Sequence, residues 1–476
     1  MKSAYFRELQ RYSKQDIANA FHTDLDTVVK LLRRLKSCGV VKAVNFQAEE
    51  ISRLEFSLQD ENCSDVDLGV SNQLFVFTFV GVIAIDDYVF KCYPKYIKGN
   101  VEPLQELKQV LQVIKKYNSK AHIISMSNGL DEQSPFNMLA IMLFLINDYY
   151  ENGLYSNQRS ILEVNGEGEI NWDTTINESF AFLIENRPVY TDLHTCNVID
   201  DTDNIIRRIH QAIISYCSNL LRSAGLSDLF DLEDLVLTDE ELGDIGEEDY
   251  LLYQLSKELN VQFITRKQIL LKTLYAFISQ KSLLEHGFGL SMYGTSSFHT
   301  VWENVCSKVF GSHLHCKLKD LPILLNRDYI PVQNKTLIEL IEKPKWIACM
   351  DGNTYPHVVP DTLIPDLITI FQSKNKTCFG IFDAKYYVIT LDKSKVSGQP
   401  GIGDITKQYL YQRAYAGFLQ DHNISNVLNA FLCPGNSACV EILGEAELDM
   451  LHSLDLCNIQ VWKLPATSMY EWYLDN

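Results

Sequence analysis

The 476-residue chain lacks most of the short motifs that mark a particular chemistry. It contains no GxxxxGK[ST] sequence, so it has no P-loop for binding a nucleoside triphosphate. It also contains no GxSxG nucleophile elbow, no HExxH zinc helix and no glycine fingerprint of a dinucleotide-binding fold. If the function consumes a nucleoside triphosphate, a partner must bind it.

Long apolar runs are also missing. The longest, residues 138–146, is far shorter than the roughly 20 residues that a membrane-spanning helix needs. The first ten residues contain neither an apolar segment nor a small-residue cleavage site, so no secretory signal is expected. We therefore expect a cytoplasmic protein without a membrane partner.

Closely spaced cysteine pairs are absent as well. The twelve cysteines contain no CxxC pair, which favours reduced thiols over a disulfide framework. The tightest group of potential metal ligands is His313, His315 and Cys316. Because it has no second ligand pair at zinc spacing, a structural zinc site is not expected there.

Basic residues are scarce overall but not everywhere. The net charge is −19, and residues 228–249 contain eleven acidic and no basic side chains. This segment is expected to be a solvated loop or a docking surface for a basic partner. The balance is reversed in residues 1–45, with nine basic and four acidic side chains, and in residues 366–420, with seven and four. Nucleic acid is therefore a candidate ligand of both segments.

The N-terminal segment has the pattern of two short helices followed by a strand. Ser13 is placed to cap a first helix, residues 22–24 form a turn, and a second helix has an apolar face and a basic face. The run at 40–44 is rich in β-branched residues. This pattern resembles the winged-helix family, whose second helix reads the DNA major groove. The resemblance implies that the DNA-contacting residues of that helix are Lys30, Arg33 and Arg34. Many winged helices, however, serve only to dock proteins.

The middle of the chain is expected to be a mixed α/β region. Residues 74–97 predict two strands that are broken near Gly81 and turned at Asp86 and Asp87. Further elements are predicted from periodicity and turn signals: a helix from Leu104, an apolar helix from Ser134 to Tyr150, a β-like piece at 163–176, and helices around 204–222 and 266–284.

The residues that best indicate a chemistry lie between positions 360 and 390. Asp383, Ala384 and Lys385 stand inside an apolar run with strand character. Asp366 follows a proline and opens the strand-like segment that precedes this run. Asp361 also follows a proline and is the alternative metal ligand, but it lies among loop residues. Charged residues inside apolar strands are costly unless they pair or bind a metal. We therefore expect these side chains to form a site.

Phosphodiester hydrolysis needs this combination of side chains. On adjacent antiparallel strands, Asp366 and Asp383 can point to one place, and Lys385 lies on the same sheet face as Asp383 because side chains alternate. Mg²⁺ prefers a few carboxylates and retains several waters, so two carboxylates and the Ala384 carbonyl suit it. The lysine can orient the attacking water and stabilise the charged phosphate. Mn²⁺ is a possible substitute.

At these positions the sequence resembles the PD-(D/E)xK nuclease superfamily, whose core is αβββαβ. The segment before the site, residues 296–310, predicts a helix that carries Glu303, which the resemblance assigns as an auxiliary acid. After the site, residues 404–420 predict a helix capped by Asp404, followed by a strand. The tyrosines around the site are interpreted either as DNA-stacking residues or as core residues: Tyr386, Tyr387, Tyr409, Tyr411 and Tyr415.

Longer words resemble the LlaJI-type restriction endonuclease family, relatives of the McrC nuclease subunit. They are YPKYI, GEINWDTTI, VWENV, IPDLI, IFDAKYY, GDITKQYLYQRAY and NAFLCP. The resemblance implies that Asp366 and Asp383 are metal ligands, that Lys385 is the catalytic lysine, and that the scissile DNA backbone is contacted by two residues of the following helix: Gln408 and Tyr411. It also implies an McrB-like AAA+ GTPase partner, in agreement with the missing P-loop.

The sequence therefore predicts an α/β multidomain protein with a winged-helix module at 1–50, a mixed α/β middle domain at 51–290 that engages a partner or DNA, and a PD-(D/E)xK nuclease domain at 291–476. The predicted function is Mg²⁺-dependent cleavage of double-stranded DNA within a restriction system. The alternative is a non-catalytic DNA-binding adaptor or regulator that keeps a vestigial nuclease fold.

Overall fold

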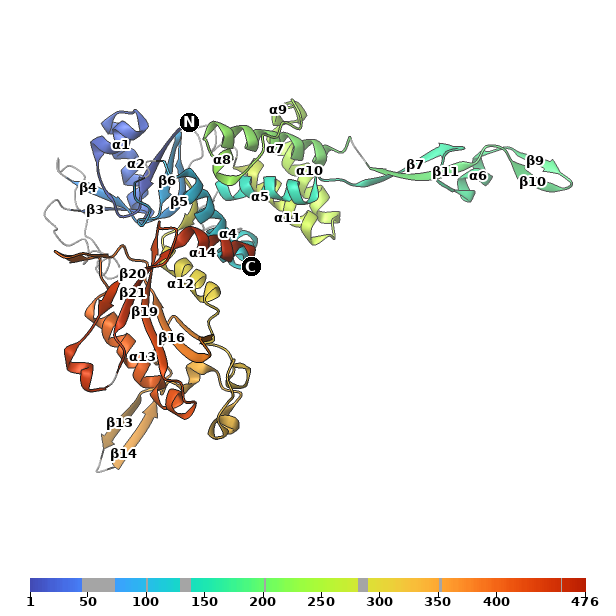
Figure 1. The fold of residues 1–476 in the computed structure, drawn as a ribbon. Coiled ribbons are helices and arrows are strands. Elements are labelled where there is room, and N and C mark those ends of the chain that lie inside the picture. The colour runs from blue at the N-terminus through green and yellow to red at the C-terminus, as the bar shows by residue number, and fades with distance from the viewer. Residues whose placement is uncertain are drawn as a thin grey trace. The chain divides into compact units, whose positions relative to one another are not determined.

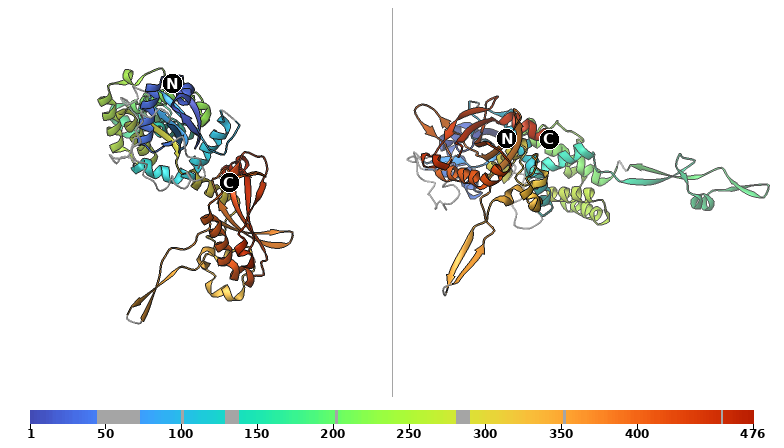
Figure 2. Two further views of the ribbon diagram at one scale, coloured as in Figure 1. Left: turned by 90° about the vertical axis from the view of Figure 1, so that its left-hand side faces the viewer. Right: turned by 60° about the horizontal axis from the view of Figure 1, so that its bottom comes forward.

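The computed structural model describes residues 1–44, 73–99, 102–128, 138–200, 203–280, 290–350, 353–454 and 456–476 (Figures 1 and 2). The chain divides into two compact units. The larger unit comprises Ser3–Ile83, Val89–Asn128 and Tyr293–Asn476, and the smaller unit comprises Met1–Lys2, Ala84–Tyr88 and Gly129–Met292. Within the described residues, no helix is long and apolar enough to cross a membrane. The three predicted domain ranges stay a prediction.

The larger unit begins with the predicted helix pair. Its elements are β1 (Lys2–Arg7), β2 (Arg11–Ser13), α1 (Lys14–Phe21), α2 (Leu25–Ser37), β3 (Val41–Val44) and β4 (Leu74–Phe77). Ser13 caps α1 in a reciprocal capping box with Asp16, as the sequence predicts, and Asp24 caps α2. Strands β2, β4 and β3 form a small antiparallel sheet, so β4 extends this module beyond residue 50. The winged-helix assignment itself stays a prediction.

A second sheet of four strands has the order β1-β6-β5-β12, with β5 (Val80–Ile85), β6 (Tyr88–Tyr93) and β12 (Leu290–Thr295). The turn at Asp86 and Asp87 is confirmed, and the break predicted near Gly81 is found just before it, since Gly81 itself lies within β5. A Cβ at Gly81 would stand 2.2 Å from the Tyr293 carbonyl oxygen. Glycine is therefore needed for the close approach of β12. The break falls at residues 78–79, so 74–97 holds three strands.

The C-terminal sheet has the order β15-β16-β19-β21-β20. Its strands are β15 (Leu367–Ser373), β16 (Lys376–Ala384), β19 (Asn426–Gly435), β20 (Glu441–Ala446) and β21 (Ile459–Pro465). β15 is antiparallel to β16, β16 and β21 are parallel to β19, and β20 is antiparallel to β21. Helices α12 (Phe298–Val309) and α13 (Ile402–Asp421) both contact β16, whereas α14 (Ala466–Asp475) contacts β21 and α4 (Leu104–Asn128). Figure 1 shows α13 lying along the sheet.

The predicted αβββαβ order is met only in part. Between α12 and α13 the C-terminal sheet receives β15 and β16, not three strands. The two other long strands of this stretch, β13 (Lys345–Met350) and β14 (Asn353–Val358), pair with each other and are exposed on both faces. They cannot occupy the core of the sheet. Shorter elements also belong to this region: β17 (Thr390–Leu391), β18 (Val396–Ser397) and 3-10 turns at Leu318–Asp320, Arg327–Val332, Leu337–Leu340 and Asp449–Leu454.

The core between α13 and the C-terminal sheet is made by alternate strand residues. Ile368 and Ile370 of β15 and Phe379 and Ile381 of β16 are buried together with Tyr415 of α13. Because strand side chains alternate between faces, Asp383 shares the α13 side of the sheet with Ile381. The apolar pattern of β16 thus directs this carboxylate toward α13.

The smaller unit is built on a group of helices. They are α5 (Met138–Asn152), α7 (Ile205–Ser223), α8 (Ser227–Phe230), α9 (Leu242–Ile245), α10 (Glu248–Val261) and α11 (Thr265–Ser279). The predicted start of α5 at Ser134 lies outside the described residues. The acidic segment 228–249 packs beside α7, whose arginines pair with two of its acids: Arg208 with Glu240 at 2.7 Å and Arg222 with Asp234 at 3.2 Å.

An arm, residues 158–200, also belongs to this unit. Strands β7 (Gln158–Val164) and β11 (His194–Asp200) form a long antiparallel ribbon, and the residues between them place α6 (Trp172–Glu178), β9 (Ala181–Ile184) and β10 (Arg187–Tyr190) at its far end (Figure 1). Strand β8 (Glu169–Ile170) adds to β11. Large apolar side chains are exposed at the far end, with 89% of Phe180 and 74% of Leu183 accessible. The sequence predicted only a β-like piece here.

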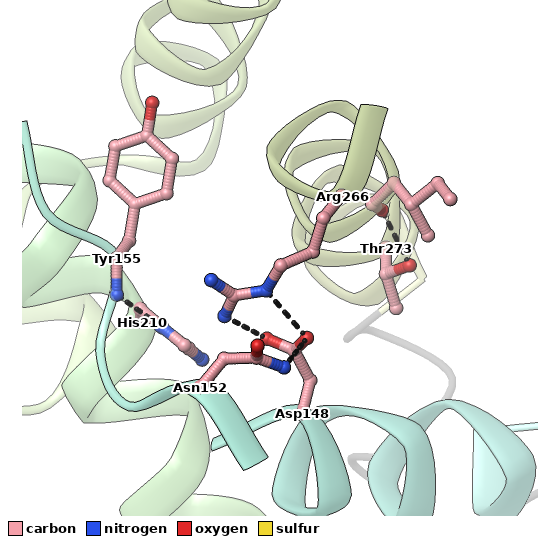
Figure 3. A network of polar contacts seen from close by, with 7 residues as sticks. Asp148, Asn152, Tyr155, His210, Arg266 and Thr273 are labelled. Carbon is pink, nitrogen blue, oxygen red and sulfur yellow. Dashed lines mark hydrogen bonds and ion pairs between the residues drawn. The ribbon is translucent and has the colours of Figure 1, made fainter. Parts of the chain in front are cut away.

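A polar network joins three helices of the smaller unit (Figure 3). The Arg266 guanidinium on α11 donates to both carboxylate oxygens of Asp148 on α5, at 3.0 and 2.7 Å. His210 on α7 is fully buried, and its Nδ1 accepts a hydrogen bond of 3.1 Å from the Tyr155 backbone. Burial lowers the pKa of His210 to about 4. The ring is therefore neutral at physiological pH.

Candidate active site

Two carboxylates predicted to act together meet at one end of the β15–β16 pair. Asp366 immediately precedes β15, Asp383 is the penultimate residue of β16, and the antiparallel register sets Leu367 opposite Phe382. The Ala384 backbone N–H donates to Asp366 Oδ2 at 2.8 Å. This hydrogen bond fixes the Asp366 side chain across the strand pair. Asp361, its competitor, is exposed in the preceding loop.

Lys385 lies between two acidic side chains. Its Nζ is 2.8 Å from Asp383 Oδ2 and 3.0 Å from Asp404 Oδ1 on α13. Only 20% of the lysine side chain is exposed, against 9% for Asp383 and 10% for Asp404. The ammonium is therefore held in a sheltered position, one residue beyond the end of β16.

The charges at this site are not balanced. Burial, together with the negative charges of Asp383 and Glu303 and a hydrogen bond between the two aspartate carboxyls, raises the pKa of Asp366 to about 8. Burial also raises the pKa of Glu303, an effect that Lys385 opposes and Asp383 strengthens. For Lys385, burial lowers the pKa, but Asp383 and Asp404 outweigh it and hold the pKa above its ordinary range. The site thus has more carboxyl groups than the single Lys385 ammonium can neutralise.

Packing around Lys385 fixes the backbone at the site. The Lys385 N–H donates to the Leu432 carbonyl on β19 at 3.0 Å, and Trp302 Nε1 of α12 donates to the same carbonyl at 2.9 Å. The next residue, Tyr386, is buried, its hydroxyl donates to Glu8, and its ring packs on Phe298. Of the two interpretations of Tyr386, core packing is therefore correct. Helix α12 also carries Glu303, whose negative charge acts on Asp366.

Two predictions for α13 are corrected by burial. Gln408 is fully buried, and Tyr411 is 4% exposed with its hydroxyl donating to the Ile364 carbonyl at 2.9 Å. Neither side chain can contact a DNA backbone in this arrangement. Tyr409 and Tyr415 are likewise core residues.

Asp404 belongs to the site, and the prediction that it caps α13 is wrong. The N-cap of α13 is Gly401, and Asp404 lies in the first turn without capping it. Its carboxylate instead faces Lys385, and its Oδ2 is buried without a hydrogen-bond partner among the described residues. An acid at the start of a helix has the same sequence pattern whether it caps or pairs, so only its distance in space from Lys385 reveals the difference.

The basic residues predicted to bind DNA are far along the chain from these acids. Lys30, Arg33 and Arg34 lie on α2 and are exposed. The buried positions of the same helix are apolar: Val28, Leu31, Leu32 and Leu35. The helix thus presents its basic face outward, as its periodicity predicts.

The donor set at the site suits a hard divalent cation with few protein ligands. Within the described residues, no group of three or more His, Cys, Asp or Glu side chains is arranged to hold a metal ion. Two carboxylates are nevertheless in contact, and the pKa of Asp366 is raised first by burial and then by the negative charges of Asp383 and Glu303, which Lys385 only partly offsets. Mg²⁺ often binds through one or two carboxylates and completes its shell with water. Asp366 and Asp383 fit that pattern.

Comparison with known proteins identifies the family. The family model described as LlaJI restriction endonuclease matches residues 79–467. The chain belongs to the LlaJI restriction endonuclease family. The range of the match contains every acidic and basic residue of the site, including Asp404. The sequence resemblance to this family is therefore confirmed, and the chain is a component of a restriction system.

The chain is also similar to one curated relative and, more weakly, to two solved structures. The LlaJI-family chain is 29% identical over 420 residues to the Type II restriction enzyme BsuMI component YdjA of Bacillus subtilis (strain 168), covering 84% of this chain and 81% of the relative. Two structures of Thermococcus gammatolerans McrBC assemblies are also similar. One, a half-complex of McrB AAA+ hexamers with bound McrC, has a TM-score of 0.38 at 13% identity and covers 100% of this chain and 99% of the matched chain. The other has a TM-score of 0.23 at 12% identity, with coverages of 58% and 79%. These scores are too low to establish a shared fold.

Proposed function

We propose that this chain is a Mg²⁺-dependent DNA endonuclease of the PD-(D/E)xK type that cleaves double-stranded DNA as the nuclease subunit of its restriction system. The observation that carries the proposal is the gathering of Asp366, Asp383 and Lys385 at the end of β16, where negative charge exceeds positive charge. Family membership supplies the biological setting.

Each residue has a distinct role in the proposed hydrolysis. Asp366, Asp383 and the Ala384 carbonyl would hold the cation, Mg²⁺ or Mn²⁺, which would supply Lewis-acid chemistry there when bound. The Lys385 ammonium donates a hydrogen bond to a phosphate oxygen and stabilises the charge that develops there. Glu303, with its raised pKa, is the auxiliary acid–base group.

The proposal includes a partner that binds a nucleoside triphosphate. The chain has no P-loop, so an McrB-like AAA+ GTPase subunit is proposed to drive or license cleavage. The arm is the proposed surface for this subunit, because exposed apolar clusters such as that of Phe180 and Leu183 are typical of protein interfaces. The exposed basic face of α2 is the proposed contact to the DNA phosphates.

The second candidate is a non-catalytic adaptor that binds DNA through α2. The exposed Lys30, Arg33 and Arg34 favour DNA binding under either function. The two functions differ at Lys385, which an adaptor does not need. An adaptor would gain nothing from keeping a sheltered ammonium between two acids, because burying such charges is costly.

The test is cleavage of plasmid DNA with Mg²⁺, with and without the GTPase partner, by wild type and by Lys385→Ala. We expect Lys385→Ala to lower the cleavage rate about 10³-fold, the effect of removing a donor to a developing charge. Lys395→Ala is the control, because it removes an exposed lysine from the same region. Equal activity of wild type and Lys385→Ala would leave the adaptor as the function.

A further inference from the structure

Asp404 and Asp383 hold the same ammonium, and they differ in what else they touch. Asp383, on β16, also contacts Asp366, whereas Asp404 contacts Lys385 from α13. Both contacts are short and sheltered from water. In such surroundings, Coulomb interactions are stronger than between exposed charges.

A divalent cation at Asp366 and Asp383 would compete with Lys385 for the Asp383 carboxylate. The competition is direct, because the Lys385 ammonium forms its ion pair with Asp383 Oδ2. With only one carboxylate in reach, Lys385 would either block the cation or leave the site. Asp404 is a second carboxylate, with which the ammonium can stay paired while Asp383 binds the cation.

We propose that Asp404 is a positioning residue that retains Lys385 beside the reaction centre when a divalent cation binds Asp383. The inference rests on the proposed function, since it assumes a cation at Asp366 and Asp383. Asp404 itself is not a ligand of that cation. Its buried Oδ2 has no hydrogen-bond partner among the described residues, so it can accept a hydrogen bond from Lys385 when the ammonium shifts.

Asp404 in a merely structural role would lead to a different expectation. An acid in the first turn of a helix interacts favourably with the helix dipole, and this needs neither burial nor a lysine. The loss of Asp404 would then change stability and leave the cation unaffected. In the positioning role, the loss of Asp404 leaves Asp383 as the remaining anion for Lys385, so the lysine competes harder with the cation.

The experiment is a thermodynamic cycle of cation binding, measured by calorimetric titration of the full chain with Mn²⁺ in the absence of DNA. The four proteins are wild type, Asp404→Asn, Lys385→Ala and the double variant. We expect Asp404→Asn to weaken Mn²⁺ binding about tenfold and Lys385→Ala to strengthen it. The double variant should bind like Lys385→Ala, because Asp404 acts through the lysine.

Two controls keep the test independent of folding and of net charge. Asp421→Asn removes one negative charge from the other end of the same helix, where Asp421 accepts a hydrogen bond from Tyr329, and it should leave Mn²⁺ binding unchanged. Asp404→Glu keeps the charge and should restore most of the affinity. Thermal unfolding identifies any variant that fails to fold, and for such a variant the Asp404→Glu comparison with wild type provides the test.

The possible results separate the inference from the function on which it rests. Equal weakening by Asp404→Asn in the wild-type and Lys385→Ala backgrounds would overturn the inference, because Asp404 would then act on the cation directly. Unchanged affinity in Asp404→Asn would also overturn it and leave Asp404 as a structural residue. If wild type and Asp383→Asn bind Mn²⁺ equally, the cation does not use Asp383, and the proposed function fails as well.

Discussion

Two buried charge clusters in this molecule are built from the same kinds of residues but differ in balance. In the smaller unit, Arg266 donates to both oxygens of Asp148, so one cation satisfies one carboxylate (Figure 3). At the end of β16, Lys385 serves Asp383 and Asp404, while Asp366 carries a raised pKa. A matched pair holds helices together. An excess of carboxylates is costly unless a cation offsets it, which is the role proposed for Mg²⁺ at this site.

Acidification gives the largest expected effect on the smaller unit. The pKa of His210 is lowered to about 4 in the folded protein, so the unfolded chain binds its proton first as the pH falls. Stability is therefore present above about pH 6.5 and is lost as the pH falls toward 4, by about 3 kcal/mol. Hydrogen exchange of α7 measures this loss. His210→Gln should remove most of the pH dependence; an unchanged slope would show that other groups cause it.

Removing Arg266 tests the matched pair. Arg266→Ala leaves the Asp148 carboxylate, whose side chain is 8% exposed, without its cation and should destabilise the smaller unit by about 2 kcal/mol. Urea unfolding measures this change. Arg222→Ala is the control, since Arg222 pairs with Asp234 at the surface, where ion pairs contribute about 0–1 kcal/mol. If the two substitutions lower the free energy of unfolding equally, the Asp148–Arg266 pair stabilises the unit no more than a surface ion pair does.

Neutralising Asp366 tests the unbalanced cluster and should have the opposite sign. An acid whose folded pKa is raised to about 8 contributes stability below about pH 4 that is lost as the pH rises through 8. Without divalent cations, Asp366→Asn should therefore be more stable than wild type at pH 8, by about 1 kcal/mol or more, and the gain should shrink at pH 5. Thermal unfolding with a chelator measures it. If Asp366→Asn is less stable than wild type at pH 8, the Asp366 charge is neutralised by a partner, as that of Asp148 is.

The smallest expected effect is at the exposed basic face of α2, which belongs to neither cluster. Arg33→Ala combined with Arg34→Ala should weaken DNA binding and lower the slope of log affinity against log salt by about 2, one for each lost phosphate contact. Fluorescence anisotropy at several salt concentrations measures the slope. Asp26→Asn on the same helix is the charge-changing control. A slope that does not change would make α2 a protein-docking helix.

Local patterns predicted the parts of the fold that depend on neighbours in the sequence. The helix pair was predictable because Ser13 and Asp16 form their capping box within four residues and α2 has a clear apolar face. Asp366, Asp383 and Lys385 were predictable because charges are unusual in apolar strands. The arm was only partly predicted, since its strands are exposed and lack the continuous apolar run that burial of both faces gives β15 and β16.

Contacts between distant positions could not be predicted. Asp148 and Arg266 lie 118 residues apart, and nothing in either segment indicates the other. Asp404 was assigned as a helix cap because its pattern fits one, although its carboxylate is used by Lys385. The αβββαβ order implied three sheet strands between α12 and α13, but β13 and β14 form a separate hairpin. Their exposure is decided by their pairing with each other.

The most direct test of the account is the position of Mn²⁺ in crystals of the protein, read from anomalous scattering. We expect one strong peak within coordination distance of both Asp366 and Asp383, with Lys385 still beside Asp404, and no such peak in Asp383→Asn crystals. A peak elsewhere, or no peak near the two aspartates at saturating Mn²⁺, would contradict the claim that these residues form the metal centre of a nuclease.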